Sequence, residues 1–224
     1  MPFRLAILAS GNGTNAQAMI DACQKGLLPI TIAVIVSNVP SANVLNRAKK
    51  AGIPACVVDH KAFANREAYD QALLAAINDY HVDAIALAGY MRLLSAHFLQ
   101  AFPGKVLNLH PAILPSFPGL HGARDAINYG VKLTGATVHF VDEIMDNGPV
   151  IIQAAVPVID TETEEELLTR IHALEHRIYP QALAWLATNR LSVQGRCVHL
   201  TPSKVNLAKP LPNAFVWPPL EDGF

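Results

Sequence analysis

The sequence is poor in cysteine and in charge, and it has no long hydrophobic run; each scarcity excludes a class of protein. The three cysteines, Cys23, Cys56 and Cys197, are far apart and contain no CxxC pair. Neither a disulfide framework nor a thiolate zinc site is therefore expected, and all three should be reduced and packed. Seventeen basic residues against eighteen acidic ones leave a net charge of −1, which provides no field to attract nucleic acid. The apolar run after Arg4 is too short for a secretory signal or a membrane span, so we expect a cytoplasmic protein.

What the sequence does have is an alternation of short apolar runs with amphipathic stretches. Gly26 and Gly52 follow two of these stretches, where a glycine commonly ends a helix. Strands that are apolar on both faces and alternate with helices are typical of a parallel sheet covered on both sides. The first half therefore predicts an α/β fold with a Rossmann-like, doubly wound, mostly parallel sheet. Its predicted strands are 4–10, 30–38, 53–59, 82–89 and 105–110, and its predicted helices are near 15–25, 42–51, 65–80 and 95–102.

The pattern changes in the second half of the chain. The apolar runs at 134–141 and 149–158 are joined by a loop that ends in Asp-Asn-Gly and leaves no room for a helix. They predict an antiparallel hairpin added to the sheet. Thr163 and Glu166 form the pattern of a capping box before a long helix, which Pro180 should kink or end.

The last part of the chain differs again. From Gly195 onward it contains several prolines and little periodicity. We therefore predict one domain over residues 1–194 and an irregular, proline-containing C-terminal tail over residues 195–224.

A glycine-rich loop, Ser10-Gly11-Asn12-Gly13-Thr14-Asn15-Ala16, separates the first predicted strand from the first predicted helix. Free backbone N–H groups and the positive end of the helix dipole favour an anion there. The loop matches the GxGxxA dinucleotide pattern, but Ser37 and Asn38 stand where that pattern expects an acidic residue, which argues against NAD. No Gly-Lys-Ser/Thr follows, which argues against a nucleoside triphosphate loop. With the small polar side chains of Thr14 and Asn15, the loop suits a single phosphate monoester; a tight capped turn without a ligand is the alternative.

Three polar side chains are candidates for catalysis. Asn108 and His110 end an apolar run that stops in prolines, and residues two apart share one face of a strand. Asp146 lies in the loop between the two predicted hairpin strands. An amide and an imidazole can stabilise the oxyanion of a tetrahedral intermediate, while a carboxylate orients the imidazole or relays a proton through water. The trio favours acyl transfer to an external nucleophile, since no GxSxG is present; a structural histidine and a turn-forming aspartate are the alternatives.

Several spaced motifs resemble those of the folate-dependent formyltransferases, and the resemblance runs through roughly residues 4–190. The glycine loop narrows it to members that formylate glycinamide ribonucleotide in purine biosynthesis. The remaining motifs are Asn108-x-His110-Pro111, Leu114-Pro115-Ser116-Phe117-Pro118-Gly119, Asp146-x-Gly148-Pro149-Val150, Phe63-x-x-Arg66-Glu67-x-Tyr69-Asp70, Ala88-Gly89-Tyr90-Met91-Arg92 and Glu175-His176-x-x-Tyr179-Pro180.

The resemblance implies that 10-formyltetrahydrofolate, as co-substrate, gives its formyl group to the glycyl amine of glycinamide ribonucleotide. It also implies small-molecule substrates, no nucleic-acid or membrane partner, no metal, and a monomer or homodimer. The implied catalytic positions are Asn108, His110 and Asp146. The implied phosphate and ribose positions are Gly13, Thr14, Asn15, His172 and Glu175. The implied folate positions are Arg66, Met91, Arg92, Leu93, Leu94, Val141, Asp142, Glu143, Ile144 and Met145.

Alternatives to this assignment come from within and outside the family. His172 stands where relatives commonly carry Gln or Lys, and residues 91–94 could instead begin a core helix. Formyltransferases that act on tRNA share the trio but are expected to carry a longer basic C-terminal domain. Formyltetrahydrofolate hydrolases share it too and carry an additional N-terminal domain. A nucleotide-binding module or nicotinamide oxidoreductase, based on GxGxxA, is the rival from another class.

Overall fold

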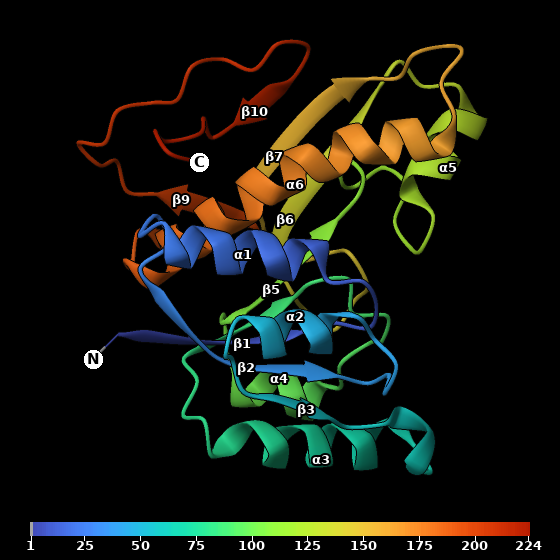
Figure 1. The fold of residues 1–224 in the computed structure, drawn as a ribbon. Coiled ribbons are helices and arrows are strands. Elements are labelled where there is room, and N and C mark those ends of the chain that lie inside the picture. The colour runs from blue at the N-terminus through green and yellow to red at the C-terminus, as the bar shows by residue number, and fades with distance from the viewer. Residues whose placement is uncertain (1) are drawn as a thin grey trace. The chain divides into compact units, whose positions relative to one another are not determined.

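The computed structural model describes residues 2–224. The chain forms two compact units, one ending at Asn108 and the other beginning at Leu109 (Figure 1). Each unit has its own strands, and strand β5 (Val106–His110) begins in the first unit and ends in the second.

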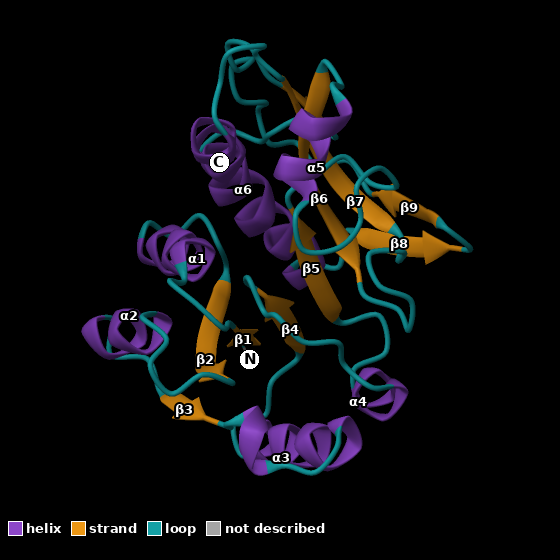
Figure 2. Ribbon diagram, turned by 90° about the vertical axis from the view of Figure 1, so that its right-hand side faces the viewer, coloured by secondary structure: helices purple, strands orange, loops and turns teal. Residues whose placement is uncertain are grey.

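The first unit contains a parallel sheet whose strands are hydrogen-bonded in the order β5-β4-β1-β2-β3. Figure 2 shows α1 and α2 on one side of these strands and α3 and α4 on the other. This is the doubly wound arrangement that the alternation of runs predicted, and the prediction is confirmed. The strands are β1 (Phe3–Leu8), β2 (Ile30–Ser37), β3 (Ala55–Val57) and β4 (Ala84–Leu87), and the helices are α1 (Thr14–Gln24), α2 (Val44–Lys50), the short 3-10 helix η1 (His60–Ala62), α3 (Arg66–Asn78) and α4 (Ala96–Ala101).

The central strands of this sheet are buried along most of their length. Leu5, Ile7 and Leu8 of β1 are fully inaccessible to solvent, as a strand covered by helices on both faces requires. The helices end where glycine permits a left-handed backbone, with φ of 72° at Gly26 and 67° at Gly52. Both helix ends are therefore placed as the sequence predicted.

The second unit contains antiparallel strands and the longest helix. Strands β6 and β7 pair antiparallel, as predicted for the added hairpin, and β10 pairs antiparallel with the other edge of β7. Strands β8 and β9 form a separate antiparallel hairpin. The elements are α5 (Gly122–Tyr129), β6 (Leu133–Phe140), β7 (Val150–Pro157), α6 (Glu164–Ala187), β8 (Leu191–Gln194), β9 (Cys197–Leu200) and β10 (Phe215–Trp217).

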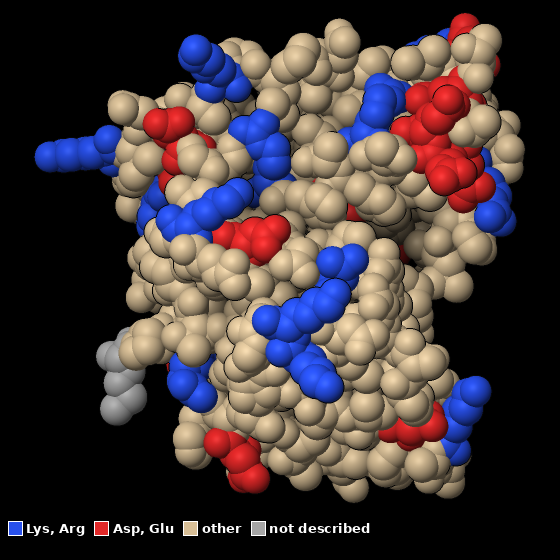
Figure 3. All heavy atoms as spheres, viewed as in Figure 1, with Lys and Arg blue, Asp and Glu red and all other residues tan. Residues whose placement is uncertain are grey.

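Helix α6 begins with the predicted capping box. The Thr163 hydroxyl accepts from the N–H of Glu166 at 3.2 Å, and the Glu166 carboxylate accepts from the N–H of Thr163 at 2.8 Å. Figure 3 shows acidic side chains gathered over this end of the helix, with basic side chains beside them. Two ion pairs connect these groups, Arg170 with Glu162 at 2.7 Å and Arg124 with Glu164 at 2.9 Å.

Pro180 does not end α6, because the helix continues to Ala187, so of the two predicted outcomes only a kink stays a prediction. Proline removes one helical hydrogen bond, but every residue from Ile178 to Leu186 is buried. The burial of this apolar segment outweighs the missing bond.

The segment from 195 to 224 is less irregular than the sequence indicated, since it contains β9 and β10. Such short strands show no alternation that a sequence pattern could detect. Side-chain contacts also hold the segment: Arg190 pairs with Glu221 at 2.7 Å, and Gln181 Oε1 accepts from the N–H of Glu221 at 2.6 Å. A domain boundary at 194/195 stays a prediction.

The three cysteines are reduced as expected, but not all of them are packed. All three are free thiols. Burial raises the pKa of Cys23 to about 11, so this thiol stays protonated and packs as a small apolar group. Cys197 is exposed on β9, so the packing role does not extend to it. Within residues 2–224, no helix combines the length and apolarity needed to cross a membrane.

Candidate active site

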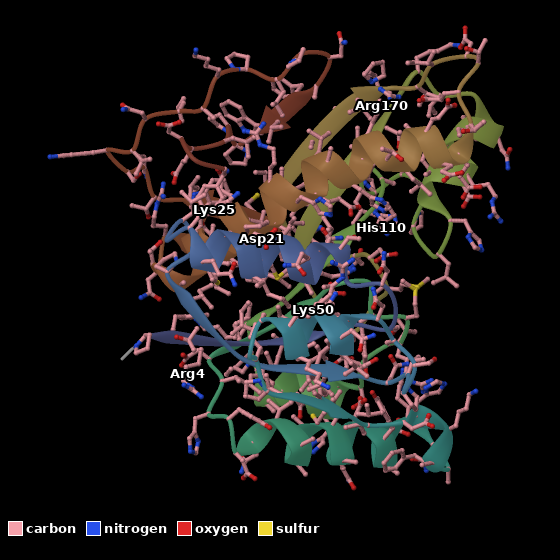
Figure 4. All side chains as sticks on the ribbon, in the orientation of Figure 1. Arg4, Asp21, Lys25, Lys50, His110 and Arg170 are labelled. Carbon is pink, nitrogen blue, oxygen red and sulfur yellow. The ribbon has the colours of Figure 1, made fainter. Side chains whose placement is uncertain are left out.

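His110 is the last residue of β5, and its side chain is almost fully buried (Figure 4). Its Nε2 lies 2.7 Å from the carbonyl oxygen of Phe117, which can only accept, so Nε2 carries a proton. Its Nδ1 lies 3.5 Å from Oδ2 of Asp146. Both ring nitrogens therefore face oxygen acceptors, an arrangement suited to holding a proton and delivering it.

The loop at 141–149 holds Asp146 in position. Asp146 has a left-handed backbone with φ of 53°, and its Oδ2 accepts from the N–H of Gly119 at 2.8 Å. Asp142 braces the loop by accepting from the N–H of Ile144 and from the side chain of Asn147, both at 3.0 Å. A Cβ at Gly148 would lie 1.7 Å from the carbonyl oxygen of Phe140, so only glycine fits there. These contacts fix the orientation of the Asp146 carboxylate.

A second histidine, His139 on β6, lies on the other side of Asp146. Its Nδ1 donates to the carbonyl of Phe140 at 2.8 Å, and its Nε2 lies 3.9 Å from Oδ1 of Asp146. Burial lowers the pKa of His139, although that hydrogen bond and the carboxylate oppose the shift. The neutral ring is thereby favoured. Sequence reasoning did not select His139, although an ionisable residue inside a strand that is otherwise buried could have indicated it.

The structure thus brings together two members of the predicted trio, His110 and Asp146, within the second unit. Asn108, the third member, closes the first unit on the same strand as His110, two residues before it, and is half-buried. Alternation along β5 gives the two side chains one face of the strand.

The glycine loop lies in the first unit between β1 and α1. Gly13 precedes the helix with a left-handed backbone, no side-chain hydrogen bond caps the helix, and no acidic residue lies in its first turn. Thr14 and Asn15 are the first two residues of α1. Asn38 stands where a dinucleotide-binding fold carries an acidic residue. Its side-chain oxygen accepts a hydrogen bond from the Ser10 hydroxyl at 2.6 Å. The start of α1 thus carries neither a side-chain cap nor an acidic residue, and anion binding by the loop stays a prediction.

Residues 91–94, also in the first unit, lie before α4 rather than beginning it. Ser95 caps that helix by accepting from the N–H of Phe98. Met91 and Leu93 are exposed at 62% and 53%, whereas Leu94 is buried. The Met91 N–H donates to the Ser10 hydroxyl at 2.9 Å. The core-helix alternative is therefore wrong for this segment, which presents two apolar side chains to solvent.

The arginines predicted for folate differ in their surroundings. Arg92 lies over the ring of Tyr69, 5.1 Å from its centroid, whereas Arg66 is exposed at the start of α3 and pairs with Glu67 at 3.7 Å. The hydroxyls of Tyr69 and Tyr90 are hydrogen-bonded to each other, and burial raises the pKa of both. Tyr69 is therefore neutral and offers a fixed aromatic face to the Arg92 cation.

The remaining predicted residues lie in the second unit. Ile144 and Met145 of the 141–145 segment are exposed. Glu175 on α6 is buried, and its carboxylate lies 3.9 Å from Nε2 of the half-exposed His172. His172 and His176 stack with ring centroids 6.5 Å apart. Over the described part of the chain, no group of three His, Cys, Asp or Glu side chains is arranged to hold a metal ion.

Comparison with known proteins identifies the family and fold that the chain resembles. The sequence pattern described as formyl transferase matches residues 3–183. The phosphoribosylglycinamide formyltransferase of Escherichia coli (strain K12) is 43% identical over 189 residues, which are 84% of this chain and 89% of that protein. The trifunctional purine biosynthetic protein adenosine-3 of Drosophila melanogaster is 46% identical over 185 residues, and the match spans only 14% of that longer protein. The crystal structure of glycinamide ribonucleotide transformylase 1 from Symbiobacterium toebii superposes with a TM-score of 0.88 at 47% identity, covering 90% of this chain and 95% of that one.

Proposed function

The chain belongs to the formyl transferase family, and we propose that it transfers the formyl group of 10-formyltetrahydrofolate to the glycyl amine of 5′-phosphoribosylglycinamide. The products are formylglycinamide ribonucleotide and tetrahydrofolate, in de novo purine biosynthesis. The observation that carries the proposal is the buried pair of His110 and Asp146, 3.5 Å apart at the end of β5. Such a pair suits proton transfer during attack on a carbonyl carbon.

In the proposed mechanism, the amine nitrogen attacks the formyl carbon directly, with no covalent enzyme intermediate. The formyl oxygen becomes an oxyanion, to which Asn108 donates a hydrogen bond and to which His110 donates from Nε2 in place of its bond to the Phe117 carbonyl. The bond from carbon to the folate nitrogen N10 then breaks. The nitrogen N10 gains a proton from His110, and the amine loses one through water to the pair of His110 and Asp146. Holding both substrates together can contribute on the order of 7–11 kcal/mol in favourable cases.

The nucleotide is proposed to be held at its phosphate and its ribose. Backbone N–H groups and side chains of Gly13, Thr14 and Asn15 take the phosphate, which the uncapped start of α1 supports. The buried carboxylate of Glu175 accepts from ribose hydroxyls, with His172 beside it.

The folate is proposed to be held through apolar packing and backbone contacts. The exposed side chains of Met91, Leu93, Ile144 and Met145 support this, since solvent-exposed apolar groups are available to cover a pterin. The full set assigned to folate is Arg66, Met91, Arg92, Leu93, Leu94, Val141, Asp142, Glu143, Ile144 and Met145. We further propose that the protein is cytoplasmic, uses no metal, binds neither nucleic acid nor membranes, and is a monomer or homodimer.

A two-substrate assay tests the proposed function. The protein is mixed with 10-formyltetrahydrofolate and glycinamide ribonucleotide, and formylated product is measured. A parallel titration with NAD(P)H and with a folate analogue separates this function from an oxidoreductase. Turnover together with folate binding is expected; nicotinamide binding without folate binding would replace the proposal.

A further inference from the structure

We propose that Arg47, on α2, is a positioning residue that holds the glycine loop in its anion-binding conformation. The proposal rests on the proposed function, because the anion would be the phosphate of the nucleotide substrate. It concerns the first unit alone, where α2 packs beside the loop. Arg47 belongs to none of the motifs that carry the family resemblance.

Three hydrogen bonds join the guanidinium of Arg47 to the loop and to α1. Its Nε donates to the backbone oxygen of Asn12 at 2.7 Å, its Nη2 to Oδ1 of Asn12 at 3.2 Å, and its Nη1 to Oε1 of Gln17 at 3.3 Å. Asn43, at the N-cap position of the same helix, donates from its side-chain amide to Oδ1 of Asn12 at 2.7 Å. A planar guanidinium that engages three acceptors is fixed in one orientation, unlike a solvated surface cation.

These contacts orient the backbone of the loop. In a trans peptide the carbonyl oxygen and the amide hydrogen point in opposite directions. The carbonyl of Asn12 shares its peptide with the N–H of Gly13, so the bond from Arg47 turns that N–H away from α2. The preceding peptide is held in the same way, since the N–H of Val44 donates to the carbonyl of Gly11 at 3.2 Å. Two successive N–H groups are thereby directed away from the helix, as in an anion-binding nest.

The close approach of α2 supports the same role. A Cβ placed on Gly13 would lie 2.6 Å from Cγ2 of Val44, so the helix packs directly against the loop. A cation on the Asn12 carbonyl also polarises that peptide and strengthens its N–H as a donor. Arg47 therefore acts on the phosphate through the Gly13 amide rather than by touching it.

Replacement of Arg47 by Met tests this role, with Lys50→Met as the matched control. Lys50, labelled in Figure 4, is an exposed cation on the same helix and makes none of these loop contacts. In R47M we expect the KM for glycinamide ribonucleotide to rise about tenfold, a loss typical of a charge-assisted hydrogen bond. The KM for the folate and kcat should change less than twofold. R47K should recover part of the loss, because an ammonium can hold the carbonyl but not all three acceptors.

Calorimetric binding of inorganic phosphate gives a readout that does not depend on turnover. Wild-type protein and K50M should bind phosphate alike, and R47M about tenfold more weakly. An active wild type in which R47M keeps both its nucleotide KM and its phosphate affinity would overturn the proposal. An equal loss in K50M would overturn it too, since it would indicate net charge alone. If R47M does not fold, the comparison of R47K with wild type decides. Absence of formyl transfer in the wild type would instead remove the proposed function.

Discussion

Two loops of this formyltransferase contrast in what they present. The glycine loop at 10–13 presents backbone N–H groups, and its conformation depends on a positive φ at Gly13 and on contacts from α2. The loop at 141–149 presents one carboxylate, that of Asp146, and its backbone serves to aim it. A backbone site is sensitive to the shape of the chain, whereas a side-chain site is sensitive to the chemistry of one group. Substitutions at the two loops should therefore affect different kinetic constants.

The largest effect is expected from Asp146→Asn, which keeps the shape of the side chain and removes its charge. We expect kcat to fall by about 10³-fold, since loss of a positioned proton-transfer group costs roughly 10²–10⁴-fold. Both KM values should stay within a few-fold. Steady-state kinetics with Asp160→Asn, an exposed acid paired with Lys132, provides the control. A kcat near that of the wild type in D146N would remove Asp146 from the mechanism.

Gly13→Ala should act on binding instead. A Cβ there would clash with the side chain of Val44, and the left-handed backbone at position 13 is strained for alanine. The loop must therefore shift. We expect the nucleotide KM to rise at least tenfold and the free energy of unfolding to fall by about 1 kcal/mol or more. Gly26→Ala is the matched control, because its φ is similarly positive but nothing lies near its Cβ. Equal changes in the two variants would show that backbone strain alone explains the result.

The smallest effect concerns the dependence of stability on pH. Because burial lowers the pKa of His139, the unfolded chain binds its proton more tightly than the folded one. Stability should therefore fall as pH drops below about 6.5, the ordinary histidine pKa, toward the folded value. His110, Asp146 and Asp142 also act electrostatically on this ring.

The variant His139→Asn should flatten that dependence, since Asn can still donate to Phe140 but does not titrate. Urea unfolding at pH 7.5 and 5.5 measures it, with exposed His199→Asn as the control. Identical pH dependence in H139N and wild type would contradict the assignment.

The local sequence pattern was sufficient to predict the strands and helices that bury many of their side chains. The runs at 30–38 and 134–141 became β2 and β6, whose interior residues are almost all buried, and Thr163 with Glu166 correctly marked the start of α6. The helix does not end at Pro180, because the local cost of the proline is smaller than the gain from burying its neighbours. Strand β10 escaped detection because its pairing with β7 is a long-range event.

The candidate site was predictable only where a residue carried a local signal or a family motif. Arg47 stands with Lys49 and Lys50 in the last turn of α2, where basic residues commonly complement the helix dipole. The sequence does not indicate which of these three basic residues contacts the glycine loop. Only the hydrogen bonds to Asn12 in the structure single out Arg47. His139 likewise could not be selected from its own strand, because the tertiary fold brings Asp146 close to it.

The hydrogen bond between Ser10 and Asn38 has a consequence for attempts to redesign cofactor preference. Replacing Asn38 by Asp would supply the acidic residue that the GxGxxA dinucleotide pattern lacks in this sequence. The Asn38 side chain, however, is 2% exposed and already bonded to the Ser10 hydroxyl, which in turn accepts from the N–H of Met91. A carboxylate there would be occupied and out of reach of a ribose. Converting this scaffold to a dinucleotide binder would require rebuilding the end of β2 rather than a single exchange.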